Sequence, residues 1–307
     1  MGAHMPSTPL CPNPGADQAY NDSLKRIKIL QSHETNGFNP SLKTILLTQG
    51  KRTKKAVLWF HGYTAATLQF KPLAELCFKK GYNVLVPCIP HHGMKDRMTN
   101  EVSKIRMKEL VQFTNYMVDV MHGLGDKIVV GGLSMGGVMS SWVAQYRPDV
   151  ATSIIIAPFL GARIIPTKLI PLVVFATGLL PDIRQWWDPE KKMECDGPKY
   201  GYPQYSYKSL RQVLKMGMKI RADARKRKPT AKKVYMVIND HDESVNNELC
   251  QQLVDNWEGM RATNVQTHHF PDALGIPHDC ISIEEPQGKT NLVYSVLMKI
   301  VEGKEVK

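Results

Sequence analysis

The sequence predicts an α/β fold in which a mainly parallel sheet is covered by helices on both faces. Short, unbroken apolar segments alternate with amphipathic helical segments along most of the 307 residues. Strands that are buried on both faces of a parallel sheet have this continuously apolar character, and helices form the connections between them. The composition, with 43% hydrophobic and 22% charged residues, is typical of a packed globular chain.

The individual elements follow from the spacing of apolar residues. Residues 1–40 are polar and turn-rich and have no strong period. The next part of the chain predicts strands at 42–50, 54–62, 82–90 and 127–130, and helices at 68–81, 98–124 and 135–147. The last part predicts strands at 151–159, 232–240 and 264–270, and helices at 245–257 and 290–302.

The domain organisation is a core interrupted by one insertion. Residues 1–40 form an N-terminal extension, of which 1–4 are interpreted as an expression scar, and the core comprises 41–158 and 231–307. Residues 159–230 break the alternation, because 164–181 is apolar but holds three prolines. We interpret this insertion, with its amphipathic helix at about 207–227, as a cap over the end of the sheet. A second, independent domain is the alternative, but about 70 proline-containing residues make a marginal core.

The charge of the chain is strongly positive. Lys and Arg number 40 against 28 Asp and Glu, a net charge of +12, and the densest basic cluster is 221–228. Such an excess favours anionic partners, and peripheral contact with an anionic membrane surface is one candidate. No nucleic-acid-binding motif is found, so we expect no nucleic-acid partner. The cysteines form no CxxC pair, so we expect no zinc site of that kind. No secretory or transmembrane segment is visible, which favours a cytoplasmic location.

The segment GLSMG, Gly132 to Gly136, fits the G-x-S-x-G pattern between a strand and a helix. Such a turn presents the Ser134 hydroxyl at the edge of the sheet and at the N-terminus of a helix. Side chains at Gly132 or Gly136 would collide with the neighbouring strand or helix. The amide of Met135 would face a developing oxyanion, and a second donor is expected after an earlier strand, at Tyr63. His61, just before it, is interpreted as structural.

The partners of the serine are expected in the order acid, then histidine. Asp242 lies just beyond the strand at 232–240 and is the preferred acid, with Asp240 as the alternative. His278 lies in a loop beyond the last strand and could reach Ser134, whereas His268 and His269 are expected to be strand residues. In this arrangement His278 removes the serine proton and Asp242 holds the other ring nitrogen.

These motifs give the chain a resemblance to the α/β-hydrolase superfamily, and most to bacterial carboxylesterases and monoacylglycerol-lipase-like serine hydrolases. The matching segments are HGYTA, GYNVLVPCIPHHG, GLSMGG, DHDESV and PHD, in family order from about residue 54 to 300. His91 stands where the family has the first glycine of a GHG element. The resemblance implies ester hydrolysis through an acyl-serine, with no metal or cofactor.

The predicted function is therefore hydrolysis of carboxylic esters with hydrophobic acyl groups, a small-molecule substrate class. An apolar pocket under the cap is expected to bind the acyl group, through Tyr63, Leu169, Phe175, Trp186 and Trp187. An acyltransferase or thioesterase with the same three residues is the first alternative. A non-catalytic ligand receptor on this fold, or a basic interaction protein, are the others.

Overall fold

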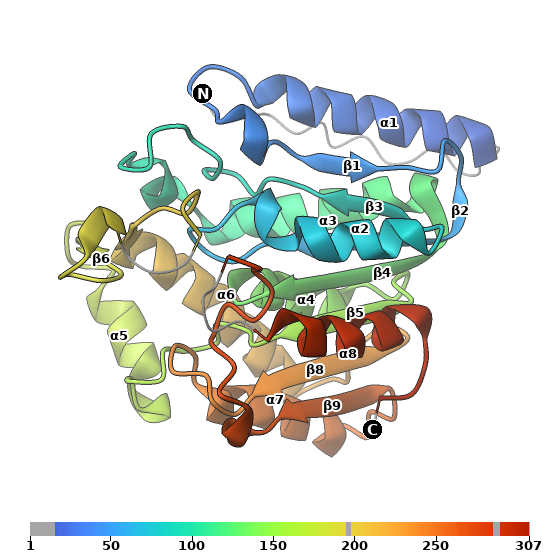
Figure 1. The fold of residues 1–307 in the computed structure, drawn as a ribbon. Helices are drawn as coiled ribbons and strands as arrows, with labels where there is room; N and C mark the ends of the chain where they lie inside the picture. Colours follow the sequence, from blue (N-terminus) through green and yellow to red (C-terminus); the bar gives the residue numbers. More distant parts are fainter. Residues whose placement is uncertain (1–15, 195–197, 285–288, 307) are drawn as a thin grey trace.

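The computed structural model describes residues 16–194, 198–284 and 289–306, and its centre is a seven-stranded sheet (Figure 1). The strand order is β1-β3-β2-β4-β5-β8-β9, and only β1 runs antiparallel to its neighbour. The strands are β1 (Ile45–Leu47), β2 (Thr53–Phe60), β3 (Asn83–Val86), β4 (Gly125–Leu133), β5 (Thr152–Ile156), β8 (Val234–Asn239) and β9 (Val265–Phe270). The predicted mainly parallel sheet is confirmed.

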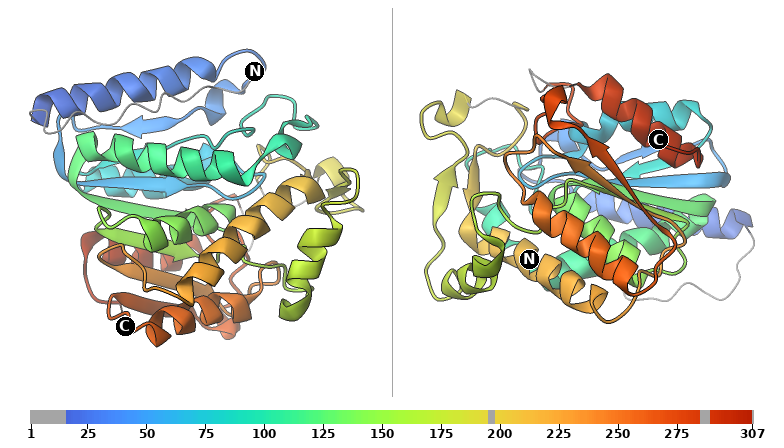
Figure 2. Two further views of the ribbon diagram at one scale, coloured as in Figure 1. Left: turned by 180° about the vertical axis from the view of Figure 1, so that it is seen from behind. Right: turned by 90° about the horizontal axis from the view of Figure 1, so that it is seen from below.

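Helices cover both faces of the sheet because its central strands are apolar on both sides. In β2, Ala56, Leu58 and Phe60 pack into one hydrophobic cluster, while Val57 and Trp59 pack into the other. The helices α3 (Met107–Leu124), α4 (Met135–Tyr146) and α7 (Asn247–Gly259) lie on the first face, and α2 (Lys71–Lys79) and α8 (Thr290–Glu302) lie on the second (Figures 1 and 2). The predicted covering of both faces is therefore confirmed.

The N-terminal part of the chain contains a helix that the sequence analysis did not predict, α1 (Ala16–His33). It packs along α3 through a stripe that includes Tyr20 and Ile27, and the Ser23 hydroxyl donates to the Val120 carbonyl at 2.7 Å. A side chain at Gly123 would overlap the α1 backbone, so glycine allows the two helices to approach closely. The apolar spacing in α1 was a usable signal, but many polar residues surround it.

The long helix expected at 98–124 begins only at Met107. A 3₁₀ turn at Glu101–Lys104 precedes it, and the backbone at Arg106 is extended, with φ −128° and ψ 140°. The Met98 carbonyl accepts from the Arg184 side chain at 3.0 Å, in contact with the insertion. The backbone before residue 107 therefore follows tertiary contacts rather than a helix.

His91 ties the loop after β3 to this region. Its Nδ1 lies 3.1 Å from a Glu101 oxygen and its Nε2 lies 3.0 Å from a Glu109 oxygen, so both ring nitrogens face carboxylates. Burial lowers the pKa of His91, but the hydrogen bonds and charges of Glu109 and Glu101 outweigh it, and the net pKa is raised. The backbone at His91 has φ 70°, so a side chain is held in a conformation that favours glycine.

This cluster makes a prediction about pH. Because the folded pKa of His91 is raised above its unfolded value of about 6.5, its stabilisation is full below that pH. The stabilisation is lost as the pH rises through the folded pKa. We expect His91→Gln, which keeps the backbone strain but not the charge, to lower the melting temperature at pH 6 by about 2–4 °C. Thermal unfolding at pH 6 and pH 9 checks this, and a gap that stays constant between the two pH values would contradict it.

The described residues of 159–230, the segment that the sequence analysis interprets as an insertion, lie beyond the carboxyl ends of the strands (Figure 1). The segment contains α5 (Ile170–Ala176), the hairpin of β6 (Arg184–Trp186) with β7 (Gln204–Ser206), and α6 (Tyr207–Ala224). Its buried residues, among them Ile170 and Val213, belong to the same hydrophobic cluster as one face of the sheet. Among the described residues, no helix is long and apolar enough to cross a bilayer.

Candidate active site

Ser134 occupies a strained turn between β4 and α4. Its backbone has φ 58° and ψ −113°, a conformation that costs a non-glycine residue about 1–3 kcal/mol. Hydrogen bonds from the surrounding loops hold it there: the Ser134 amide donates to the Ile156 carbonyl at 3.0 Å, and the Phe159 amide donates to the Ser134 carbonyl at 3.1 Å. Ser134 is 8% exposed and lines a cavity.

The glycines on either side of Ser134 are needed for close packing. A Cβ atom at Gly136 would overlap the carbonyl oxygen of Phe60 in β2. A Cβ atom at Gly132 would overlap the backbone of Gly136 in the first turn of α4. The collisions predicted from the sequence are thus confirmed. Because glycine has no side chain, the turn can bring the helix this close to two strands.

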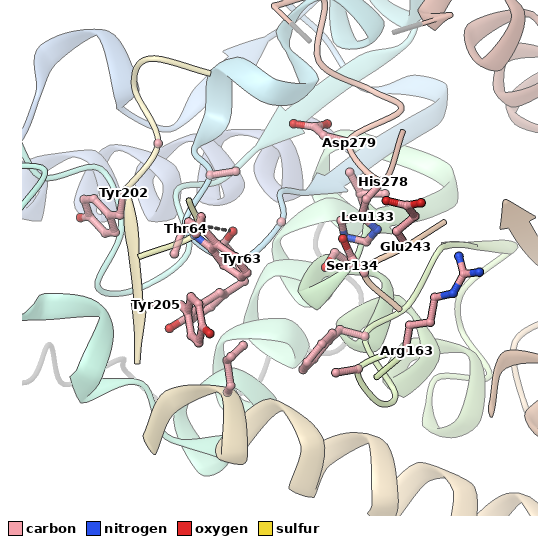
Figure 3. A pocket seen from close by; sticks show the side chains of 18 of the residues that line it. Tyr63, Thr64, Leu133, Ser134, Arg163, Tyr202, Tyr205, Glu243, His278 and Asp279 are labelled. Atoms are coloured by element: carbon pink, nitrogen blue, oxygen red, sulfur yellow. Dashed lines mark hydrogen bonds between the residues drawn. The ribbon is translucent and has the colours of Figure 1, made fainter. Parts of the chain in front are cut away.

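His278 and Asp242 form a pair beside the serine. The Nδ1 of His278 donates to Asp242 Oδ2 at 2.6 Å, while Asp242 Oδ1 accepts from the amides of Ser244 at 2.8 Å and Val245 at 3.1 Å. Burial raises the pKa of Asp242, but attraction to His278 and these hydrogen bonds outweigh it, and the net pKa is lowered. Ser134 and His278 line the same cavity, and Figure 3 shows their side chains pointing toward one another.

The alternative acid lies elsewhere. Asp240 pairs with His269 Nδ1 at 3.0 Å, and both side chains are more than 40% exposed. His268 packs edge-on against Phe270 in the same strand, with ring centroids 4.8 Å apart. The geometry therefore joins Asp242, and not Asp240, to His278.

A cavity of about 540 Å³ opens between the core and the insertion. Most of its lining is apolar or aromatic, and much of it comes from the insertion: Phe159, Ile165, Val173, Trp187, Tyr202, Tyr205, Leu210 and Leu214. Cavities of this size and character are typical of sites for small molecules. The sequence analysis missed Leu210 and Leu214 as lining residues, although both lie in the amphipathic helix that it predicted at about 207–227.

Only some of the residues that were expected to bind the acyl group line the cavity. Tyr63 and Trp187 line the cavity, whereas Leu169, Phe175 and Trp186 do not. The helix α5 buries Ile170 and Val174, so its periodicity turns Leu169 and Phe175 outward, where they are 47% and 63% exposed. Hydrophobicity alone could not indicate which face of this helix points inward.

Two main-chain amides are candidate oxyanion donors. The Met135 amide begins α4, and the helix dipole adds to its positive field. The Tyr63 amide lies in the turn after β2, at the cavity wall. Among the described residues, neither amide donates to a protein acceptor.

Buried polar groups hold the turn after β2. His61 Nδ1 donates to the Gly62 carbonyl at 2.9 Å, and its Nε2 accepts from the Ile89 amide at 3.0 Å. Burial lowers the pKa of His61 to about 4, so the ring is neutral at pH 7 and fully engaged, in agreement with a structural role. The Gly62 amide donates to Gln69 Oε1 at 2.7 Å.

Further charged groups lie at the cavity and were not anticipated. Arg163 donates from Nη1 to the Asp242 carbonyl at 2.9 Å, and Arg97 and Arg211 also line the cavity. Burial raises the pKa of Asp279, against opposing hydrogen bonds from Gln69 and from the backbone. The only sequence signal for Asp279 was its position directly after His278.

A family model described as serine aminopeptidase, S33 (Hydrolase_4) matches residues 51–274. The chain belongs to this S33 family of α/β hydrolases. The match covers the segments that carry Ser134 and Asp242, and it extends across the insertion. The resemblance found in the sequence motifs is thereby confirmed.

Two curated relatives match over shorter stretches. A thermostable monoacylglycerol lipase of Bacillus sp. (strain H-257) is 32% identical over 100 residues, which are 31% of this chain and 36% of the lipase. The esterase YjfP of Escherichia coli (strain K12) is 26% identical over 102 residues, 31% of this chain and 41% of the esterase. The matched stretch thus spans well under half of either relative.

Solved structures support the fold over most of the chain. A monoacylglycerol lipase of Paleococcus ferrophilus aligns with a TM-score of 0.63 at 16% identity, covering 85% of this chain and 98% of the lipase. A soluble variant of the Saccharomyces cerevisiae monoglyceride lipase aligns with a TM-score of 0.65 at 14% identity, covering 85% and 91%. At these identities the likeness establishes the α/β-hydrolase fold alone.

Proposed function

We propose that this S33 hydrolase cleaves carboxylic esters of hydrophobic acids through an acyl-serine, with Ser134, His278 and Asp242 as a catalytic triad. The observation that carries the proposal is the 2.6 Å hydrogen bond between His278 and buried Asp242. His278 and Ser134 line the same cavity. A serine hydroxyl is a weak nucleophile, and an adjacent imidazole oriented by a carboxylate activates it.

The chemistry follows from this arrangement. The Ser134 oxygen attacks the ester carbonyl while His278 Nε2 takes the hydroxyl proton, and the amides of Tyr63 and Met135 donate to the oxygen that becomes negative. The carbon–oxygen bond to the alcohol then breaks, and the alcohol leaves with the proton from His278. Water next gives a proton to His278 and attacks the acyl carbon. The bond between that carbon and the Ser134 oxygen then breaks, the acid is released, and His278 returns the proton to the serine oxygen. Asp242 stabilises the imidazolium in both halves.

The substrate class follows from the lining of the cavity. We propose that the insertion acts as a cap whose apolar residues Val173, Leu210 and Leu214 bind a hydrophobic acyl group. Short or medium acyl esters and monoacylglycerols fit this chemistry, and the similarity to a monoacylglycerol lipase supports it. Exposed Leu172 and Phe175, with the net charge of +12, support peripheral contact with an anionic membrane, which sedimentation with anionic and neutral vesicles tests.

The test is hydrolysis of p-nitrophenyl esters of graded acyl length. Because apolar surface contributes roughly 25 cal/mol per Å², we expect kcat/KM to rise from acetate to a medium-chain ester and then to fall as the chain outgrows the cavity. A fluorophosphonate should label Ser134, as peptide mass analysis would show. A protein that binds these esters without turnover or labelling would instead be a receptor. Product analysis with added alcohol or thioester separates a hydrolase from an acyltransferase or thioesterase.

A further inference from the structure

The turn after β2 is strained at the residue that follows the candidate oxyanion donor. Thr64 has φ 60°, a left-handed conformation that is unfavourable for a β-branched side chain. Such conformations persist only where the surrounding structure holds them, and they cluster at functional sites. The Tyr63 N–H lies in the preceding peptide unit, between Gly62 and Tyr63, so the contacts that hold Tyr63 and Thr64 in this turn also bear on its direction.

The insertion holds Thr64 through two hydrogen bonds. The indole Nε1 of Trp187 donates to the Thr64 hydroxyl at 3.0 Å, and the Tyr202 amide donates to the Thr64 carbonyl at 2.8 Å. The Thr64 hydroxyl itself donates to the Tyr63 carbonyl at 2.6 Å. A side chain and a backbone group of the insertion thus bind the hydroxyl and the carbonyl oxygen of Thr64, respectively.

The insertion also holds the side chain of Tyr63. The Tyr63 hydroxyl lies 2.6 Å from the Ser209 hydroxyl in the first turn of α6. It also accepts from the Ser206 amide at 2.9 Å. The Tyr63 ring packs edge-on against Trp187, with centroids 6.2 Å apart, so these contacts form one connected unit.

The core holds the other side of the turn. The Thr64 amide donates to Nε2 of His92 at 3.3 Å, and His92 is buried beside His61. Burial lowers the pKa of His92 well below its usual value, which keeps the ring neutral and its Nε2 able to accept. The turn is therefore clamped between core and insertion, and Figure 3 shows Tyr63 and Thr64 together at the cavity wall.

We propose that the insertion, through Trp187 and Ser209, positions the Tyr63 amide for the oxyanion. This inference rests on the proposed function and deepens it. Trp187 and Ser209 are positioning residues in this role, because they act through Thr64 and the Tyr63 side chain. Preorganised donors stabilise the transition state more than the bound ester, so the loss of their alignment lowers kcat rather than substrate affinity.

The experiment is Trp187→Phe, which keeps an aromatic ring at the cavity and removes the indole N–H. We expect kcat to fall on the order of tenfold, below the about 100- to 1000-fold cost of deleting one oxyanion donor, with KM within about twofold. Affinity for a trifluoromethyl ketone, which forms an oxyanion adduct, should fall with kcat/KM. Affinity for a non-hydrolysable ether analogue of the ester should not change.

The matched control is Trp142→Phe in α4, since the Trp142 indole N–H is buried and has no hydrogen-bond partner among the residues that the structure describes. This control should behave as wild type. A cycle of Trp187→Phe with Thr64→Val should be non-additive, because both changes remove the same hydrogen bond. Ser209→Ala gives a second, independent variant, with the same expected fall in kcat and an unchanged KM.

Three results would overturn the inference. One is a kcat for both Trp187→Phe and Ser209→Ala equal to that of the control. Another is a rise in KM with unchanged kcat, which would make Trp187 a substrate contact only. The third is full additivity of the cycle. If the wild type hydrolyses esters through Ser134, each of these results leaves the proposed function intact. An inactive wild type would overturn both the proposed function and this inference.

Discussion

Replacement of Ser134 by alanine is expected to lower kcat for ester hydrolysis by about 10³-fold or more. Only the hydroxyl group is removed, and without it the acyl-enzyme cannot form. The variant should also no longer react with a fluorophosphonate. Because Ser134 lies at the cavity surface and is held through backbone hydrogen bonds, we expect the fold to be kept. Initial rates with a p-nitrophenyl ester and intact-protein mass spectrometry measure the two effects.

The control for this variant is Ser140→Ala in the same helix. The Ser140 hydroxyl is buried and has no hydrogen-bond partner within the described part of the chain, so its removal changes neither the cavity nor a hydrogen bond there. It should keep wild-type rates and labelling. Substantial ester hydrolysis by Ser134→Ala, or labelling at another serine, would refute the assignment of the nucleophile.

Asp242→Asn is expected to lower kcat by about 10⁴-fold, because an amide neither selects the required histidine tautomer nor stabilises the imidazolium. The Asn oxygen can still accept from the amides of Ser244 and Val245, so the turn should be kept. KM should change little, since the carboxylate does not face the cavity. Steady-state kinetics measure both quantities, and circular dichroism verifies folding.

Asp240→Asn is the matched comparison, at the same strand end and only two residues away. Asp240 pairs with exposed His269, and a surface pair of this kind contributes little. We expect activity within about twofold of wild type. A large loss in Asp240→Asn together with a small one in Asp242→Asn would reverse the assignment of the acid.

Much of the core was predictable because it is encoded locally. The apolar segments around Val57 and Val129 identify buried strands, and their helical connections imply a parallel sheet. The beginning of the helix at Met107 was not predictable, because the backbone before it follows contacts with Arg184 and with the 3₁₀ turn. The helix at 16–33 has apolar residues at helical spacing, but the many polar residues between them obscure this pattern.

The candidate site divides in the same way. Ser134, His278 and the glycines beside the serine stand in sequence patterns whose chemistry follows from residue type. The choice between Asp240 and Asp242 depends on which carboxylate the turn after β8 directs at His278, and spacing along the chain does not contain that direction.

The sequence by itself determined the α/β sheet, the glycine turn around Ser134 and the choice of His278 as the candidate histidine, because strand burial and tight glycine turns depend on short stretches of chain. Tertiary structure alone decided which side of α5 faces the cavity and that Trp187 reaches Thr64 across 123 positions of the sequence, and it joins the histidine to Asp242, the aspartate that the sequence analysis preferred. These depend on how distant segments pack, and a hydrogen bond exists only where packing brings donor and acceptor to about 3 Å.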